Sequence, residues 1–137
     1  MPPDQSQSQL KRRLFSFLYA FRGWYFVLRT QPNAWIHAAF TIFAIGLGFW
    51  LEITRQEWAV LVLTFMAVWI AEFMNTALEA VIDLVSPDYH PLAKVAKDVA
   101  AAAVLVGAIG AVIIGLLILG PPLLLKVCGF VSLPVCG

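Results

Sequence analysis

Residues 58–85, WAVLVLTFMAVWIAEFMNTALEAVIDLV, decide the fold, because they combine an apolar helix with a row of polar side chains. The first part, WAVLVLTFMAVWI, carries no charge and would form the first half of a membrane span. Glu72, Asn75, Glu79 and Asp83 then follow at helical spacing, within an arc of about 80° and over about 16 Å of helix. The stretch therefore predicts a transmembrane helix with one polar face.

The composition of the whole chain agrees with a membrane protein. Of its 137 residues 61% are hydrophobic and 12% are charged, whereas soluble domains carry about 25% charged residues. We expect an all-α membrane protein with one membrane domain at 10–125, between a disordered segment 1–9 and a tail 126–137 of unknown role. Residues 10–29 predict a basic amphipathic surface helix, and the expected spans are 34–51, 58–85 and about 92–120.

The distribution of Lys and Arg predicts the orientation of these spans. The N-terminal segment carries five basic residues, and the connection between the second and third spans carries Lys94 and Lys97. The short turn at 52–57 has only Arg55, and the tail has only Lys126. Because basic residues favour the cytoplasmic side, we expect the N-terminus and the second connection to face the cytoplasm. Cys128 and Cys136 do not have the spacing of a metal site.

The acids of the second span need a physical reason to be there. A carboxylate at the centre of a bilayer costs about 2.5–3.5 kcal/mol, so acids in spans usually mark a functional site. Carboxylates suit Mg²⁺, lysines suit phosphate, and together they are the components of phosphoryl transfer from ATP. Two alternatives remain open: structural pairing between helices, for example with Lys97, and a small oligomeric cation- or proton-coupled transporter.

The region 71–105, AEFMNTALEAVIDLVSPDYHPLAKVAKDVAAAAVL, resembles the signature of the bacterial diacylglycerol kinase family. The matching pattern is E-x-x-N-[ST]-A-[IL]-E-x-x-[VI]-D, followed by Y/F-H and A-K-D, and a weaker similarity extends over about residues 10–120. The resemblance implies a homotrimer of three-span subunits in the bacterial inner membrane, with active sites shared between subunits. It also implies that Mg·ATP phosphorylates diacylglycerol to phosphatidic acid, or undecaprenol in the other branch of the family.

The resemblance also assigns roles to individual residues. Glu72 matches the general base that acts on the lipid hydroxyl, and Asn75 matches the amide beside it in the lipid site. Glu79 matches a magnesium ligand near the ATP phosphates, and Lys97 with Asp98 matches a pair that contacts ATP, Asp98 orienting Lys97 or the nucleotide. The remaining matches are to residues near the nucleotide: Arg12, Tyr19, Asp88, Tyr89 and His90.

One position departs from the family pattern. Gln31, in RTQPNAWIH, stands where the family usually has a glutamate that serves as a second metal ligand. An amide oxygen can coordinate magnesium but brings no charge, so a raised magnesium requirement is expected. His37, in the first span, is expected to be a packed or hydrogen-bonded histidine rather than a metal ligand.

Overall fold

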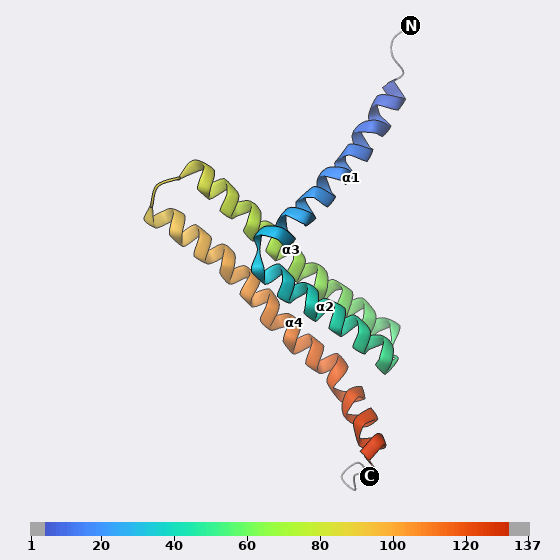
Figure 1. The fold of residues 1–137 in the computed structure, drawn as a ribbon. Helices are drawn as coiled ribbons and strands as arrows, with labels where there is room; N and C mark the ends of the chain where they lie inside the picture. Colours follow the sequence, from blue (N-terminus) through green and yellow to red (C-terminus); the bar gives the residue numbers. More distant parts are fainter. Residues whose placement is uncertain (1–4, 132–137) are drawn as a thin grey trace. The chain divides into compact units, whose positions relative to one another are not determined.

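The computed structural model describes residues 5–131, all of them in helices or short connections. The helices are α1 (Gln5–Thr30), α2 (Pro32–Leu51), α3 (Arg55–Val85) and α4 (Pro91–Val131) (Figure 1). Three helical stretches are long and apolar enough to cross a membrane: Pro32–Leu51, Arg55–Val85 and Pro91–Gly129. The prediction of an all-α protein with three spans is therefore confirmed. Cys136 lies outside the described residues, so the expectation about the two cysteines stays a prediction.

The structure divides between Trp35 and Ile36 into two compact units, which are described separately. In the first unit, α1 begins at Gln5, five residues before the expected start of the surface helix. The polar residues QSQSQ had indicated disorder, but glutamine has nearly the helix propensity of leucine and extends the helix. Along α1, apolar side chains such as Phe15, Phe17 and Phe21 are more than half exposed.

The break between α1 and α2 is confined to Gln31. The Gln31 N–H still donates to the Val27 carbonyl (2.9 Å), and the Gln31 carbonyl accepts from Ala34 N–H (3.1 Å). Pro32 occupies the first position of α2, where its missing N–H leaves no helical bond unmade. A break between the helices expected at 10–29 and 34–51 is therefore present, but it is one residue long and not four.

The α2–α3 turn is built from two local signals. Ile53 N–H donates to the Gly48 carbonyl and Glu52 N–H to the Phe49 carbonyl, each over 3.3 Å, while Glu52 takes a φ of 56°. This is the Schellman ending of a helix, with Glu52 at the left-handed position. Thr54 then caps α3 in a reciprocal capping box with Glu57. The chain thus reverses direction within a few residues.

In the second unit, α3 packs most closely against α4, and the two helices run side by side as an antiparallel hairpin (Figure 1). A Cβ built on Gly107 of α4 would lie 3.9 Å from the Val68 Cα of α3, which is close for two helix backbones. Near the α2–α3 turn, a buried cluster joins all three helices through Leu51, Leu61 and Leu119. This packing fixes the polar face of α3 relative to α2 and α4.

The last helix is longer than the sequence indicated. α4 continues to Val131 through Pro121 and Pro122, where the third span was expected to end. The prolines deprive the carbonyls of Leu117 and Ile118 of their helical donors and favour a bend, and α4 bends towards its red end in Figure 1. Beyond the prolines, Lys126 Nζ donates to the Trp50 carbonyl (2.5 Å) and lies 5.0 Å from the centre of the Trp50 ring. This contact ties the end of α4 to the end of α2.

Candidate functional site at the α3–α4 end

The polar face of α3 runs from the protein interior to the α3–α4 loop. Glu72 is 1% exposed and Asn75 is 8% exposed, Glu79 is half-buried, and the Asp83 side chain is 64% exposed. The four residues share one face because of their spacing, and α2 and α4 cover only the deeper part of it. The helix therefore carries acids in environments that change from buried to open within about three turns.

Glu72 is the deepest acid, and its partner comes from another helix. Its Oε2 lies 3.8 Å from Nε2 of His37 on α2, and the His37 side chain is 13% exposed. Neither carboxylate oxygen of Glu72 has a hydrogen-bond partner among the described residues, and neither does His37 Nε2. His37 is therefore a packed histidine, which is one of the two forms expected from the sequence. The sequence did not reveal this pairing, although His37 is the only titratable residue within 34–51.

One turn nearer the loop, Asn75 contacts Glu79, the expected metal ligand. Its Nδ2 donates to Glu79 Oε1 over 3.2 Å, whereas its buried Oδ1 has no hydrogen-bond partner in the described chain. The Thr76 hydroxyl donates to the Glu72 carbonyl (2.9 Å), which is a hydrogen bond within α3. Asn75 thus orients the Glu79 carboxylate and retains one unused acceptor.

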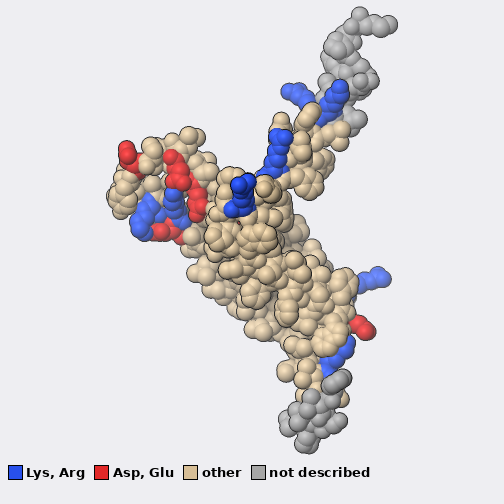
Figure 2. Space-filling view, in the orientation of Figure 1, with Lys and Arg blue, Asp and Glu red and all other residues tan. Residues whose placement is uncertain are grey.

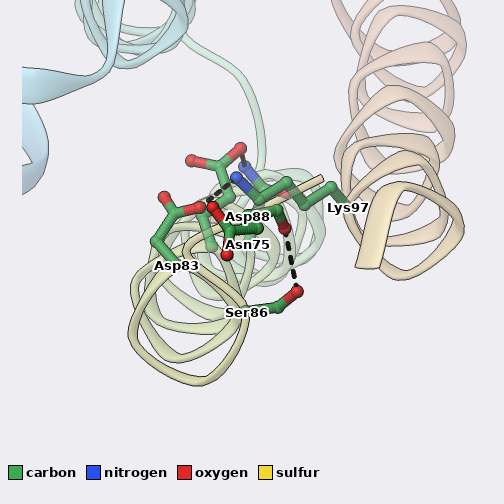
Figure 3. A network of polar contacts seen from close by, with 6 residues as sticks. Asn75, Asp83, Ser86, Asp88 and Lys97 are labelled. Carbon is green, nitrogen blue, oxygen red and sulfur yellow. Dashed lines mark hydrogen bonds and ion pairs between the residues drawn. The ribbon is translucent and has the colours of Figure 1, made fainter. Parts of the chain in front are cut away.

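Two ion pairs lie at the loop end of the hairpin, one between the two helices and one within α4. Lys97 reaches from α4 to Asp83 on α3 (Figure 3). Asp98 pairs with Lys94, one helical turn away, with Nζ and Oδ2 2.5 Å apart. Asp98 thus pairs with Lys94 and not with Lys97, because neighbouring residues on a helix point about 100° apart. The expectation that Asp98 orients Lys97 or the nucleotide stays a prediction.

An open cleft of about 360 Å³ lies beside these pairs. Both helices and the loop line it, through Ile82, Asp83, Ser86, Pro87, Asp88, Tyr89, His90, Ala93, Lys94 and Lys97. Within the loop, the Ser86 hydroxyl donates to the Asp88 carbonyl (3.1 Å; Figure 3), and His90 Nδ1 accepts from Leu92 N–H (3.2 Å). Figure 2 shows red and blue side chains gathered at this end of the hairpin, with tan side chains over its middle.

The structure brings together some of the predicted site residues and leaves others apart. Asp88, Tyr89, His90 and Lys97 line the cleft, and Glu72 lies deeper on α3, outside its lining. The predicted nucleotide contacts of Arg12, Tyr19 and Gln31 stay predictions, because these residues belong to the first unit. In that unit, the Arg22 guanidinium lies 5.8 Å from the centre of the Tyr19 ring.

The carboxylate of Glu79 could bind magnesium together with the phosphates of a nucleotide. Within residues 5–131, no three His, Cys, Asp or Glu side chains form a ready metal cage. Glu79 does offer a half-buried carboxylate held by an amide. Mg²⁺ is commonly bound by one or two carboxylates together with substrate phosphates. The residues therefore fit an ion that arrives with a nucleotide better than one held permanently.

Helices long enough to span a membrane and an acid–lysine cleft at one end define the class as a multi-pass membrane protein with an open polar cleft. Residues 18–119 match the family described as prokaryotic diacylglycerol kinase. The chain belongs to this family and is a lipid kinase. Family membership does not support the transporter alternative.

Three curated relatives illustrate the similarity. An undecaprenol kinase from Bacillus subtilis is 40% identical over 123 residues, which cover 90% of this chain and 100% of the relative. A diacylglycerol kinase from Synechocystis is 48% identical over 112 residues, covering 81% of this chain and 64% of the relative. A diacylglycerol kinase from Escherichia coli is 39% identical over 87 residues, 58% of this chain and 71% of that protein.

Proposed function

We propose that the protein transfers the γ-phosphate of ATP to the hydroxyl of diacylglycerol, producing phosphatidic acid. The observation that carries the proposal is the continuous polar face of α3, which connects the buried Glu72 to the exposed Asp83–Lys97 pair. A lipid alcohol and a water-soluble nucleotide prefer opposite ends of such a face. The reaction would take place between these two ends, near Asn75 and Glu79.

In the proposed step, the lipid oxygen attacks the γ-phosphorus. The new oxygen–phosphorus bond forms, the bond between the γ-phosphorus and the β–γ bridging oxygen breaks, and ADP leaves with that electron pair. Glu72 takes the proton of the attacking hydroxyl, as a general base. Lys97 reduces the negative charge on the phosphates, and Asp98 holds Lys94 towards the same cleft.

The remaining candidate residues have supporting roles in this proposal. Bound magnesium would neutralise charge on the phosphates, and Glu79 together with Gln31 would hold it. Asn75 keeps the Glu79 carboxylate oriented through its 3.2 Å hydrogen bond. The loop residues Asp88, Tyr89 and His90 would contact the nucleotide, together with Arg12 and Tyr19 from α1.

The acceptor has a second candidate in undecaprenol. Diacylglycerol is supported by the 48% identity to the Synechocystis kinase. Undecaprenol is supported by the Bacillus subtilis relative, whose full length is matched. Both lipids carry one hydroxyl, so Glu72 would act on either in the same way.

We also propose the orientation and assembly that the reaction needs. The α3–α4 loop would face the cytoplasm, the source of ATP, as the positions of Lys94 and Lys97 favour. The protein would lie in the bacterial inner membrane as a homotrimer. Exposed apolar side chains on α2 and α4, among them Phe40, Phe43, Leu116 and Leu117, would face lipid or neighbouring subunits.

The test is phosphate transfer from labelled ATP by the purified protein in micelles, with diacylglycerol and undecaprenol offered separately. Glu72→Gln should lower the rate by about 10²-fold or more, since a general base contributes 10²–10⁴-fold. Glu57→Gln is the matched control, because it makes the same chemical change on α3 at the opposite end, and Gln still suits a capping box. Transfer to neither lipid by the unmodified protein, or equal rates for the two variants, would contradict the proposal.

A further inference from the structure

His37 and Glu72 form a buried polar pair whose hydrogen bonds are incomplete. The pair joins α2 to α3, and its closest atoms, Nε2 and Oε2, are 3.8 Å apart. Within the described chain, none of His37 Nε2, Glu72 Oε1 and Glu72 Oε2 has a hydrogen-bond partner. Buried polar atoms are nearly always satisfied, by protein, water or ligand. The pair therefore points to a further group that belongs between these two side chains.

The distance between the two atoms limits what that group can be. At 3.8 Å they are too far apart for a direct hydrogen bond. A single oxygen atom can lie within about 2.8–3.0 Å of both of them. A neutral Nε2–H is a donor and a carboxylate is an acceptor, so the group must both accept and donate. A hydroxyl does this, whereas a carbonyl or an ammonium group does not.

We propose that His37 binds the hydroxyl of the acceptor lipid, and this inference rests on the proposed function. The lipid hydroxyl oxygen accepts a hydrogen bond from His37 Nε2–H and donates its own hydrogen to Glu72 Oε2. During transfer the hydroxyl proton moves to Glu72 and the lipid oxygen bonds to the γ-phosphorus. His37 keeps its proton throughout and fixes the direction from which the oxygen attacks.

The packing indicates how a lipid would reach this position. Glu72 is 1% exposed, so the helices around it must separate slightly to admit a hydroxyl. α4 is the helix packed most closely against α3, and His37 comes from α2. The hydroxyl would therefore enter between α2 and α3, where it meets His37 first. An alcohol costs far less to bring into such a site than a charged group does.

Three substitutions at position 37 test the inference. His37→Gln places an amide nitrogen close to the original Nε2, His37→Asn places one close to Nδ1, and His37→Leu removes the donor while retaining bulk. We expect His37→Leu and His37→Asn to raise the KM for the lipid by about tenfold, the usual order for one lost hydrogen bond to a substrate. His37→Gln should recover most of this loss. The KM for ATP should change less than twofold in all three.

The assay uses the full-length protein in mixed micelles, with the lipid and ATP varied independently and the thermal midpoint recorded for each variant. Thr64→Val is the matched control. Thr64 is a buried polar residue on α3, the helix of Glu72, and its hydroxyl already donates to the Val60 carbonyl (2.8 Å). The control should leave both KM values unchanged.

Three outcomes would overturn the role of His37. One is an unchanged lipid KM in His37→Leu, and another is an equal rise in the KM values for lipid and ATP. The third is a lower thermal midpoint with normal kinetics, which would mean that the pair holds only a structural water. A failure of the proposed function itself looks different, since the unmodified protein would then phosphorylate neither lipid.

Discussion

Lys97 of α4 pairs with Asp83 of α3 at the loop end of the helical hairpin, beside the cleft. The side chains are 38% and 64% exposed, and ion pairs of this kind contribute only about 0–1 kcal/mol to stability. The stability gained from this ion pair therefore explains little of why a lysine occupies position 97. The position of Lys97 beside the cleft is a stronger reason.

Exchanging the two charges separates these reasons. Lys97→Met should lower the transfer rate by about 10²-fold, because one donor to the developing phosphate charge is lost. The double variant Asp83→Lys with Lys97→Asp should recover the thermal midpoint of the unmodified protein but not its rate. Recovery of the rate by the exchanged pair would show that Lys97 acts only as a structural partner of Asp83.

Gln31 offers a prediction about metal dependence. Gln31→Glu adds a negative charge to the proposed magnesium site and should lower the magnesium concentration that gives half the maximal rate, on the order of tenfold, since ligand charge tunes metal affinity. Gln31→Met removes the oxygen and should raise that concentration. The measurement is the transfer rate during a magnesium titration at fixed ATP. If all three proteins titrate alike, residue 31 is no metal ligand.

Gly48 and Gly46 form a matched pair for testing the packing at the α2–α3 turn. A Cβ on Gly48 would lie 3.0 Å from two carbons of the Trp58 ring and 3.1 Å from Ile53 Cδ1. Gly48→Ala should therefore destabilise the fold by about 1–3 kcal/mol through overpacking. A Cβ on Gly46 meets no atom within 4 Å, so Gly46→Ala should be neutral or stabilising by up to about 1 kcal/mol. Denaturation in micelles compares them, and equal midpoints would contradict this packing.

Glu52 provides a backbone prediction at the same turn. Its φ of 56° lies in the left-handed region, which costs an L-residue about 1–2 kcal/mol and glycine almost nothing. Glu52→Gly should raise the free energy of unfolding by up to about 1 kcal/mol, after the added freedom of the unfolded chain is subtracted. Glu52→Ala keeps the Cβ and should show no such gain. A similar midpoint for Gly and Ala would mean that the left-handed turn is absent in solution.

Local patterns predicted the parts of the fold that depend on local physics. The spacing of Glu72, Asn75, Glu79 and Asp83 indicated one polar face, and a helix break was expected just before the first span. The third span was expected to end near residue 120, but α4 continues through Pro121 and Pro122. Proline weakens a helix, but an apolar segment in lipid has no better way to satisfy its backbone than to remain helical.

Contacts between helices were harder to foresee. The meeting of His37 with Glu72 depends on how far α2 is shifted along α3, which no periodicity within either helix records. The partner of Asp98 was within reach of sequence reasoning, because Lys94 and Asp98 stand four residues apart on one helix face.

The change in burial along α3 has a consequence for the release of product. A neutral alcohol is easily brought beside the buried Glu72, but a phosphate monoester carries about 1.5–2 negative charges at neutral pH. Such a charge is strongly disfavoured beside a carboxylate that is 1% exposed, and less so near Asp83, where the side chain is 64% exposed. In the proposed reaction, the chemical step would therefore turn a lipid that prefers the interior of the protein into one that leaves it for the membrane surface.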